Sequence, residues 1–555
     1  MKKKKQSKKK QSFKTEYEKW QRLPDLTDAE RSRLGSMTEE EQYECFYRMV
    51  PFGTAGMRGK VGIGSNRINR YTIRLAAWGM AQVMGENAKV AIAYDTRNDS
   101  RAFAEETAKV LAYAGLKVLI FDRPSPVPLL SYTVRELQCD GGVVITASHN
   151  TKAYNGFKTY ETSGAQMGPE KTEEIFGLMK EKADSLDIPH CGDLQQENVE
   201  WIGEEISDKF IRAAADCSKL KDVSAKENLN IVYTPLFGSG RDFVLGALKL
   251  DGFSQVNLVE EQAEFNGNFP GLRKPNPEEP EVFQSAERQA LRQQADLIIG
   301  TDPDSDRIGA GVIENSKAFY FSGNQIGALL ADFLSGRDGA DGKQMVTTIV
   351  TGDLGEKIVE SRGGTVIRTL TGSKFVCEEM NNMEDGKFLL GYEESHGYVG
   401  GKHIRDKDGV SAALLLCEAA AWHKAHGRTL LDALGNLYQK YGYYIDEQDS
   451  FVFEGAKGAK LIRKIMTRLR SRGAAVFRAL GKPEKILDYS KGLDGLPPSN
   501  VLKFRFPGGS WIAVRPSGTE PKIKFYYCIR AAEQREAKKS YKSVQKSIEE
   551  FLETV

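Results

Sequence analysis

The chain has 555 residues, of which 40% are hydrophobic and 28% charged, a composition typical of soluble globular proteins and unlike that of disordered chains. At about 150 residues per domain, this length predicts three to four domains. The longest apolar stretch, residues 412–422, is far shorter than the ~20 residues that cross a bilayer, so we expect no membrane partner. The seven cysteines form no C-x-x-C pair, which favours reduced thiols in a cytoplasmic protein over disulfides or zinc.

The net charge of +2 conceals a basic N-terminus. Eight lysines and no acidic residue lie in residues 1–14, so the remaining 541 residues carry a net charge of −6. A mildly acidic body gives no support to a specific nucleic-acid surface. We expect the lysine block to be a solvated tail, with contact to RNA or anionic lipid as the alternative. No apolar segment follows it, which argues against a secretory signal.

Three stretches repeat one pattern, in which a continuous apolar run precedes an amphipathic helix and two further apolar runs. Continuous apolar runs are typical of strands buried on both faces of a parallel sheet. The predicted strands are 90–94, 117–121 and 142–146, then 230–234, 255–259 and 296–301, then 345–351, 365–370 and 388–391, with helices near 103–114, 240–248 and 354–361.

The C-terminal part has a different pattern. Strand patterns at 501–506, 510–514 and 522–529 come in close succession, and a long amphipathic helix around 541–552 follows them, with 442–453 leading in. We therefore predict three similar α/β domains with mixed, largely parallel sheets and a C-terminal α+β domain around a central cleft. The expected limits are 1–36 for the basic tail and N-terminal extension, 37–212, 213–318 and 319–443 for the α/β domains, and 444–555 for the last.

The first polar loop is Thr146-Ala-Ser148-His149-Asn150, directly after a predicted strand. Open α/β sheets bind ligands at that end of their strands, so Ser148 is a candidate nucleophile, although the loop is not the G-x-S-x-G elbow of hydrolases. Side chains of adjacent residues usually diverge, so we expect His149 to act on a substrate rather than on Ser148. An ordinary turn is the alternative.

The second loop carries Asp302, Asp304 and Asp306, here called the aspartate trio. Three carboxylates at alternate positions repel one another unless a cation binds. The spacing is not that of a calcium EF-hand, because Arg307 and Ile313 occupy the positions where glycine and glutamate are needed. An all-oxygen set with open positions suits Mg²⁺ that also contacts a phosphate; a solvated acidic turn is the alternative.

Two further loops offer groups that bind sugars and phosphates. Glu393 and Ser395 can hydrogen-bond neighbouring hydroxyls. The turn from Arg515 to Pro521 combines a guanidinium fork, hydroxyls and a flexible glycine, which suits a phosphate, and Lys524 on the next strand adds charge. Acidic loops and polar turns without such a role are the alternatives.

Two basic loops complete the set: Gly53-Thr-Ala-Gly56-Met-Arg58-Gly59, and Asp95-Thr-Arg97 at a strand end. Each is also compatible with a turn that carries a surface salt bridge. Together, the loops supply a hydroxyl nucleophile, a Mg²⁺ site, a polyol-binding loop and a remote phosphate-binding loop. The combination indicates phosphoryl transfer on a phosphorylated sugar in a cleft between four domains.

With these loops, the chain closely resembles the α-D-phosphohexomutase superfamily, in particular its bacterial phosphoglucomutase branch, which is related to phosphopentomutases. The resemblance spans nearly everything after residue 40 and covers the four loops in order. It also covers five other segments: Phe265-Asn-Gly-Asn-Phe-Pro, Pro275-Asn-Pro-Glu278, Gly323-Asn-Gln-Ile-Gly-Ala-Leu-Leu330, Thr371-Gly-Ser-Lys-Phe375 and Arg405-Asp-Lys-Asp-Gly409.

The resemblance implies a TATA-binding-protein-like fourth domain and interconversion of glucose 1-phosphate and glucose 6-phosphate through a phosphoserine and glucose 1,6-bisphosphate, which also acts as activator. It implies one Mg²⁺ per chain, bound by Ser148 and the trio. Its site residues map onto the catalytic group Ser148, His149, Lys158, Arg58 and Lys407, and onto the substrate-binding group Glu393, Ser395, Thr371, Gly372, Arg515, Ser517, Gly518, Thr519 and Lys524.

Two departures from the family pattern stand out. Thr151 replaces the proline that usually follows the asparagine of the serine loop, which predicts a looser loop. The order Ser395-His396-Gly397 leaves the sugar preference open, so phosphopentomutase and phosphomannomutase remain alternatives. A Mg²⁺-dependent phosphosugar phosphatase and a non-catalytic sugar-phosphate-binding or RNA-associated protein are alternatives from other classes. We expect a monomer or a weak homodimer.

Overall fold

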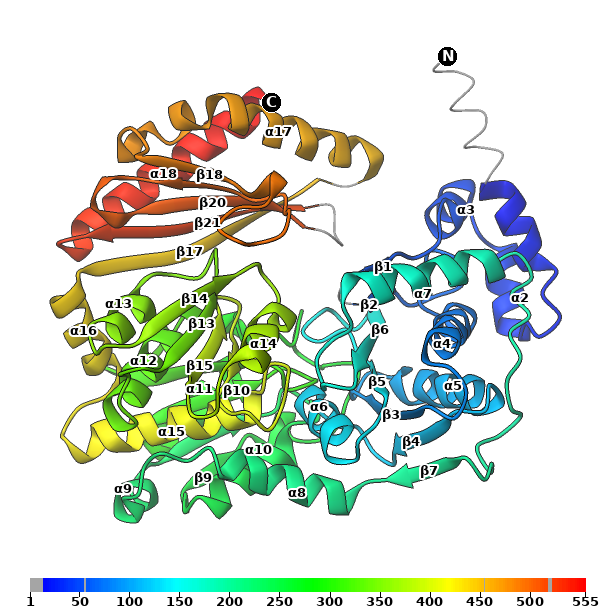
Figure 1. Cartoon of the computed structure of the whole chain (residues 1–555), viewed down its shortest axis with the longest axis horizontal. Coiled ribbons are helices and arrows are strands. Elements are labelled where there is room, and N and C mark those ends of the chain that lie inside the picture. Colours follow the sequence, from blue (N-terminus) through cyan, green and yellow to red (C-terminus); the bar gives the residue numbers. More distant parts are fainter. Residues whose placement is uncertain (1–12, 54–55, 454, 518–521) are drawn as a thin grey trace.

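Four β-sheets follow one another along the chain, each covered by helices (Figure 1). The structure is a computed structural model that describes residues 13–53, 56–453, 455–517 and 522–555. The lysine-rich segment 1–12 and two predicted phosphate-binding residues, Gly518 and Thr519, lie outside the described residues.

The first sheet has seven strands in the order β1-β2-β6-β5-β3-β4-β7. Its elements are β1 (Phe52–Gly53), β2 (Gly56–Lys60), β3 (Lys89–Tyr94), β4 (Lys117–Phe121), β5 (Gly141–Ile145), β6 (Tyr154–Glu161) and β7 (Val199–Ile202), with α4 (Arg70–Met84), α5 (Ser100–Tyr113), α6 (Val127–Glu136) and α7 (Pro169–Lys182). Alternate residues of a strand face opposite sides, so Val90 and Ile92 join the core beneath α4 and α5, while Ala91 and Ala93 join the core beneath α6.

An N-terminal cap covers the first sheet. It consists of a helical segment at residues 13–21, α2 (Asp28–Gly35) and α3 (Glu39–Phe46). Phe13 and Trp20 are buried in it, and the Trp20 ring packs edge-on against Tyr71. The part of the predicted N-terminal extension that the structure describes, residues 13–36, is therefore folded and packed against α4.

The second sheet has the order β12-β11-β10-β8-β9. Its elements are β8 (Ile231–Thr234), β9 (Val256–Leu258), β10 (Leu297–Thr301), β11 (Ile308–Glu314) and β12 (Lys317–Tyr320), with α8 (Glu204–Ala215), α9 (Val223–Glu227), α10 (Arg241–Leu250), α11 (Gln284–Gln293), η1 (Glu260–Gln262) and η2 (Pro280–Phe283). Strands β8, β9 and β10 are parallel, and β11 and β12 are antiparallel additions.

The third sheet has the order β14-β13-β15-β16. Its elements are β13 (Gln344–Thr348), β14 (Thr365–Thr369), β15 (Phe388–Glu393) and β16 (Gly397–Val399), with α12 (Gly323–Arg337), α13 (Leu354–Glu360), α14 (Ser373–Asn382), α15 (Gly409–Ala425) and α16 (Leu430–Tyr441). The long apolar stretch of the sequence lies in α15, which is buried between α10 and α12. Among the described residues, no helix has the length and apolar composition needed to span a bilayer.

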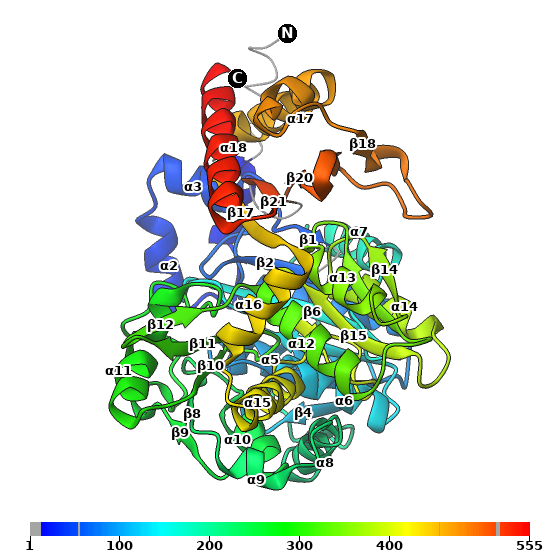
Figure 2. The same cartoon turned by 90° about the vertical axis from the view of Figure 1, so that its left-hand side faces the viewer.

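The fourth sheet is antiparallel throughout, with the order β17-β21-β20-β19-β18. Its elements are β17 (Tyr443–Val452), β18 (Lys485–Asp488), β19 (Leu502–Arg505), β20 (Trp511–Pro516) and β21 (Lys522–Ala531), with α17 (Gly455–Val476), α18 (Gln534–Thr554), η3 (Arg478–Leu480), η4 (Tyr489–Lys491) and η5 (Pro507–Gly509). Helices α17 and α18 cover its outer face (Figures 1 and 2). The segment predicted only to lead into this unit is its edge strand β17, and α17 has no counterpart among the predicted elements.

Each of the four polar loops that carry the predicted chemistry connects two neighbouring antiparallel strands. The serine loop joins β5 to β6, the aspartate loop joins β10 to β11, the glutamate loop joins β15 to β16, and the arginine turn joins β20 to β21. In the first three sheets, a strand of the parallel core thus delivers the loop, and an antiparallel strand returns from it. Because the three connections are alike, equivalent ends of the three sheets carry the serine loop, the aspartate loop and the glutamate loop.

Candidate active site

Ser148 follows β5 and is one of the residues through which the first sheet contacts the loop of the second. Its backbone is left-handed (φ 52°) and the residue is only 2% exposed. Its N–H donates to Thr146 Oγ1 (2.8 Å), and its hydroxyl donates to Asp302 Oδ2 (2.7 Å). The structure therefore joins the predicted nucleophile directly to the aspartate trio.

His149 contacts Ser148 itself. The distance between Ser148 Oγ and His149 Nδ1 is 3.1 Å, so our expectation that these side chains diverge is wrong; the left-handed turn at Ser148 brings them together. Burial lowers the pKa of His149 well below its usual value, and the positive charges of Arg307 and Arg58 lower it further. The imidazole is therefore neutral at neutral pH.

The serine loop is organised by Arg97, which the sequence left open as a surface salt bridge. Arg97 is only 4% exposed, and its Nε donates to the buried Asp95 carboxylate (3.1 Å). The rest of the guanidinium donates to the backbone carbonyls of Thr151 (2.8 Å), Tyr154 (3.0 Å), Ser148 (2.6 Å) and Asn150 (2.6 Å). A surface pair is thus excluded, and Arg97 holds the loop in which Thr151 replaces proline.

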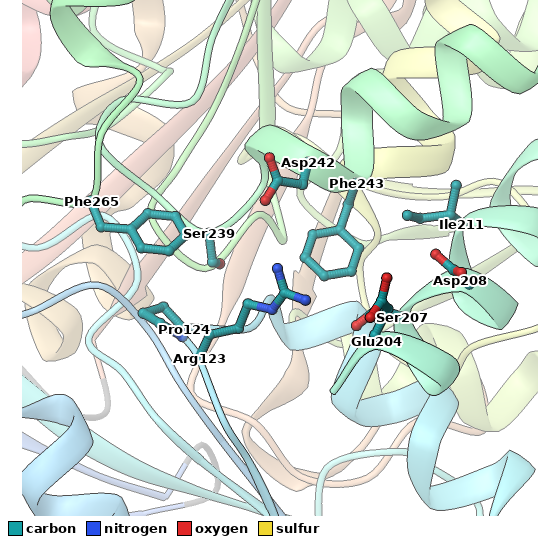
Figure 3. Close-up of a pocket in the computed structure, with 10 residues that line it drawn as sticks. All are labelled: Arg123, Pro124, Glu204, Ser207, Asp208, Ile211, Ser239, Asp242, Phe243 and Phe265. Atoms are coloured by element: carbon teal, nitrogen blue, oxygen red, sulfur yellow. The ribbon is translucent and has the colours of Figure 1, made fainter. Parts of the chain in front are cut away.

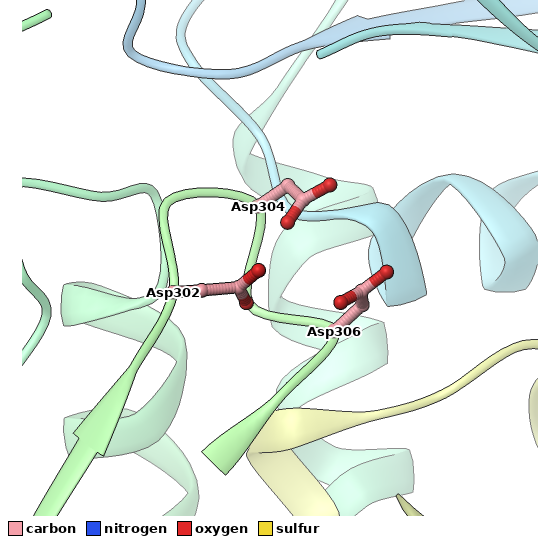
Figure 4. A group of neighbouring side chains, drawn as sticks. All are labelled: Asp302, Asp304 and Asp306. Atoms are coloured by element: carbon pink, nitrogen blue, oxygen red, sulfur yellow. The ribbon is translucent and has the colours of Figure 1, made fainter. Parts of the chain in front are cut away.

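The aspartate trio lies on the loop between β10 and β11, with its carboxylates clustered (Figure 4). One carboxylate oxygen of each residue lies within 4.8 Å of the others, and all three residues are buried. Within the described part of the chain, Asp304 Oδ1 and Asp306 Oδ1 have no hydrogen-bond partner. Buried acceptors without donors are costly, so a divalent cation fits this set of oxygens.

Three positively charged side chains surround the trio: Lys158, Lys407 and Arg307. Lys158 Nζ lies 3.0 Å from Asp304 and 3.5 Å from Asp306, and Lys407 Nζ lies 3.0 Å from Asp306. Burial raises the pKa of Asp306, but Lys407 and Lys158 outweigh burial and hold it below its usual value. Burial and the other two aspartates raise the pKa of Asp302 well above its usual value, and the charge of Arg307 offsets part of this rise.

Several groups around the trio had no predicted role. Thr146 Oγ1 lies within hydrogen-bond distance of both Asp95 (2.7 Å) and Asp304 (3.0 Å). Asp406 accepts hydrogen bonds from the Ser373 hydroxyl (2.6 Å) and from the Lys407 backbone N–H (2.8 Å). It therefore fixes the backbone of the segment 405–409, which carries Lys407. Both lie beside predicted residues in the sequence, but only the fold shows which partners they meet.

The predicted sugar-binding residues gather at the end of β15. Glu393 Oε1 accepts from the N–H of Gly372 (2.8 Å), whose φ of 126° suits glycine. This bond places the Thr371–Gly372 turn beside Glu393, as the family resemblance implies. Ser395 follows on the same loop.

The arginine turn presents two positive charges side by side. Arg515 on β20 is the cross-strand partner of Lys524 on β21, and the Ser517 N–H donates to the carbonyl of Lys522 (2.8 Å). Like charges directly opposite each other are unfavourable, and an anion between them relieves the repulsion. Burial and Glu393 raise the pKa of Glu394 to about 7, and Lys524 and Arg515 limit this rise, so the turn faces the sugar loop.

A separate pocket lies at the junction of the first two sheets (Figure 3). Its lining includes Arg123, Ser207, Asp242 and Phe265. It contains none of the predicted catalytic or binding residues. The candidate active site is therefore the meeting point of the four loops and not this pocket.

Family comparisons agree with the geometry. Four profiles match in chain order: phosphoglucomutase/phosphomannomutase alpha/beta/alpha domain I at residues 49–185, domain II at 208–315, domain III at 322–441 and the C-terminal domain at 461–541. The chain belongs to the phosphoglucomutase/phosphomannomutase family, whose members are phosphosugar mutases.

Curated relatives and solved structures narrow the comparison. The chain is 36% identical to a phosphoglucomutase of Staphylococcus haemolyticus over 89% of this chain and 93% of the relative, and 35% identical to one of Staphylococcus aureus over 88% and 91%. Its fold is similar to a putative phosphomannomutase of Thermus thermophilus (TM-score 0.69, 23% identity, 90% and 99% covered). It is also similar to the open form of Paramecium parafusin, a phosphoglucomutase (TM-score 0.67, 18% identity, 87% and 90% covered).

Proposed function

We propose that the chain is a phosphoglucomutase that interconverts glucose 1-phosphate and glucose 6-phosphate through a phosphorylated Ser148 and glucose 1,6-bisphosphate. The observation that carries this proposal is the 2.7 Å contact between Ser148 Oγ and Asp302 of the trio. Phosphoryl transfer depends on positioning and on charge neutralisation around the phosphoryl group. The site offers both, and curated relatives with the same name align over most of the chain.

One Mg²⁺ fits the trio, because its ligands are hard oxygens and, among the described residues, Asp304 Oδ1 and Asp306 Oδ1 accept no hydrogen bond. The three aspartates and an oxygen of phosphorylated Ser148 would hold the ion. When bound, it neutralises charge on the transferred phosphoryl group. Lys158, Lys407 and Arg58 place fixed positive charge near the oxygens of the transferred phosphoryl group.

In the first transfer, the free hydroxyl of glucose 1-phosphate attacks the phosphorus on Ser148, and the bond from phosphorus to Ser148 Oγ breaks. The proton of the attacking hydroxyl ends on Ser148 Oγ in the net reaction. His149, whose Nδ1 lies 3.1 Å from that oxygen, is placed to hold this proton on the way. Lys407 is ion-paired with Asp306 and therefore suits a charge-stabilising role better than that of a base.

The bisphosphate then turns over, so that its second phosphate faces Ser148. In both orientations, Glu393, Ser395, Thr371 and Gly372 bind sugar hydroxyls. Arg515, Ser517, Gly518, Thr519 and Lys524 bind the phosphate that is not reacting. We propose that these groups belong to separate domains with limits near residues 212, 318 and 443, and that closure of the fourth domain excludes water during the turn.

The test is a coupled assay of glucose 6-phosphate formation from glucose 1-phosphate, with Mg²⁺ and a catalytic amount of glucose 1,6-bisphosphate. We expect turnover that depends on both additions. Release of inorganic phosphate without isomerisation would instead identify a phosphatase. Values of kcat/KM for mannose 1-phosphate and ribose 1-phosphate, measured alongside, establish the sugar preference.

A further inference from the structure

A second cluster of titratable side chains lies outside the candidate active site. Cys217 Sγ is 3.6 Å from His403 Nδ1, and His403 Nε2 is 3.1 Å from Asp408 Oδ2. Cys217 follows α8, whereas His403 and Asp408 lie between β16 and α15. A thiol, an imidazole and a carboxylate in series form the arrangement that activates nucleophilic cysteines, and the proposed mutase reaction uses none of the three.

His403 carries a positive charge at neutral pH. Burial lowers the pKa of His403, but the Cys217 sulfur and the hydrogen bond with Asp408 outweigh burial and raise it to about 10. Each ring nitrogen then carries a proton, and each faces an acceptor. The Asp408 side chain is fully buried, and its other oxygen accepts from the Val410 N–H (2.8 Å), so the carboxylate is fixed in place.

Other elements packed against the sulfur oppose a negative charge there. The carbonyl of Ala213 lies 3.7 Å from Cys217 Sγ, and the C-terminal end of α8, which includes Asp216, is the negative end of a helix. The Phe210 ring lies 5.9 Å from the imidazole and is uncharged. His403 Nδ1 is the side-chain hydrogen-bond partner that the structure gives the Cys217 sulfur, so we expect activation of this thiol to depend on His403.

The exposure of the cysteines provides an internal comparison. Cys217 keeps 8% exposure, whereas the other buried cysteines keep between 0% and 6%. Cys191 is more exposed than Cys217, but burial and Asp193 raise the pKa of its thiol. Exposure alone therefore favours reaction at Cys191, while activation by an imidazolium favours reaction at Cys217.

We propose that Cys217 is a reactive thiol with His403 and Asp408 as its activating pair, and that a peroxide oxidises it to a sulfenic acid. The thiolate sulfur attacks one oxygen of hydrogen peroxide, so that a sulfur–oxygen bond forms and the oxygen–oxygen bond breaks. Sulfur loses two electrons to the peroxide. The departing hydroxide takes the Nδ1 proton of His403 and leaves as water.

Alkylation of the full-length protein by iodoacetamide, followed by peptide mass mapping, tests the activation. Near pH 6.5, we expect Cys217 to react at least about tenfold faster than Cys191. His403→Gln, which keeps polarity but removes the charge, should abolish this advantage and leave the rate at Cys191 unchanged. Faster labelling of Cys191 in the wild type, or an unchanged Cys217 rate in His403→Gln, would overturn the proposal.

Trapping with dimedone after exposure to hydrogen peroxide tests the oxidation itself. We expect the adduct at Cys217 in the wild type and no adduct at that position in Cys217→Ser. Cys191→Ser is the matched control and should keep the adduct at Cys217. A sulfenic acid trapped only at other cysteines, or at none, would contradict the proposed oxidation.

Discussion

The turn between β5 and β6 and the turn between β20 and β21 are held in opposite ways. In the first, Arg97 donates to four backbone carbonyls, and Ser148 is bonded to the trio. In the second, Arg515 and Lys524 are cross-strand neighbours of the same charge. The first turn is held by hydrogen bonds within the protein, whereas the second places two like charges side by side, of which Lys524 donates to Gln448 Oε1 (3.0 Å).

On the proposed function, we expect the reacting groups to be organised before substrate binds and the phosphate-binding groups to be stabilised by the substrate. Fixed dipoles and charges at a reacting centre cost no reorganisation during the reaction. A phosphate between Arg515 and Lys524 gains charge-assisted hydrogen bonds and removes their mutual repulsion. Variants in the first turn should therefore affect kcat, and variants in the second should affect KM.

The largest effect is expected from Ser148→Ala. Removal of the nucleophile should lower mutase turnover by at least about 10⁴-fold, because the other hydroxyl at the trio, Thr146 Oγ1, is already hydrogen-bonded to Asp95. The coupled assay measures turnover, and calorimetry measures sugar-phosphate binding, which should persist. Turnover within tenfold of the wild type would refute the assignment of the nucleophile.

Asp304→Asn should lower turnover by about 10²–10³-fold, because a carboxylate with one unpartnered oxygen is lost from the trio. Mg²⁺ titration of the activity should show a higher half-saturation concentration. Asp208→Asn, at an exposed carboxylate in the pocket of Figure 3, is the matched control and should behave as the wild type. Equal Mg²⁺ dependence in both variants would remove the metal assignment.

Arg97→Lys tests the restraint on the serine loop. An ammonium cannot reproduce the planar fork, so Ser148 shifts and kcat should fall by about 10²-fold, with KM nearly unchanged. Arg101→Lys on the exposed face of α5 is the control. An increase in KM without a loss of kcat would show that Arg97 does not position the nucleophile.

Arg515→Ala should raise KM for glucose 1-phosphate by about 10–100-fold, with a smaller change in the rate of transfer at Ser148. The comparison is with Arg505→Ala, on β19 of the same sheet, where the side chain is exposed. Steady-state and single-turnover kinetics separate the two effects. Loss of single-turnover rate without weaker binding would count against the proposed role of the turn.

The smallest effect on turnover is expected from Asp446, which lies on β17 beside Gly352, at the junction of the third and fourth sheets. Its effect is on the pH dependence of stability. Burial raises the pKa of Asp446 from 3.8 to about 7. The folded state thus favours the protonated form of Asp446. The contribution of this group to the free energy of unfolding is complete below pH 3.8 and is lost as pH rises through about 7. We expect a stability loss of about 4 kcal/mol across this window, because each of the roughly three pH units contributes about 1.4 kcal/mol.

Urea unfolding at several pH values measures this loss. Asp446→Asn keeps the shape of the side chain and cannot ionise, so its stability should depend less on pH between 4 and 7. An identical pH profile in the variant and the wild type would show that Asp446 ionises without cost.

Most of the architecture was predictable because apolar runs and helical periodicity are local properties. The strand 117–121 was predicted with its observed limits, and 90–94, 142–146 and 296–301 came within a residue or two of β3, β5 and β10. The edge strand β17 was not recognised, because half-exposed edge positions such as Glu447 and Asp449 lack an apolar run.

The candidate site was predictable to the extent that its residues lie at strand ends. The trio, Ser148 and Glu393 were all selected on that basis. The role of Arg97 was left open, because the sequence does not distinguish a buried arginine from one at the surface. The contact between Ser148 and His149 was wrongly excluded, because the left-handed backbone at Ser148 is imposed by Thr146 and Arg97, which bond to the loop from other positions.

The order of apolar and polar residues along the chain determined which segments form strands and helices, and it concentrated carboxylates and hydroxyls at strand ends. Only the tertiary structure decided which of these groups meet. Ser148 and Asp302 are 154 positions apart in the chain, and the Cys217–His403 pair is separated by 186. Such contacts depend on how sheets and helices pack, which is a property of the whole chain and not of any segment.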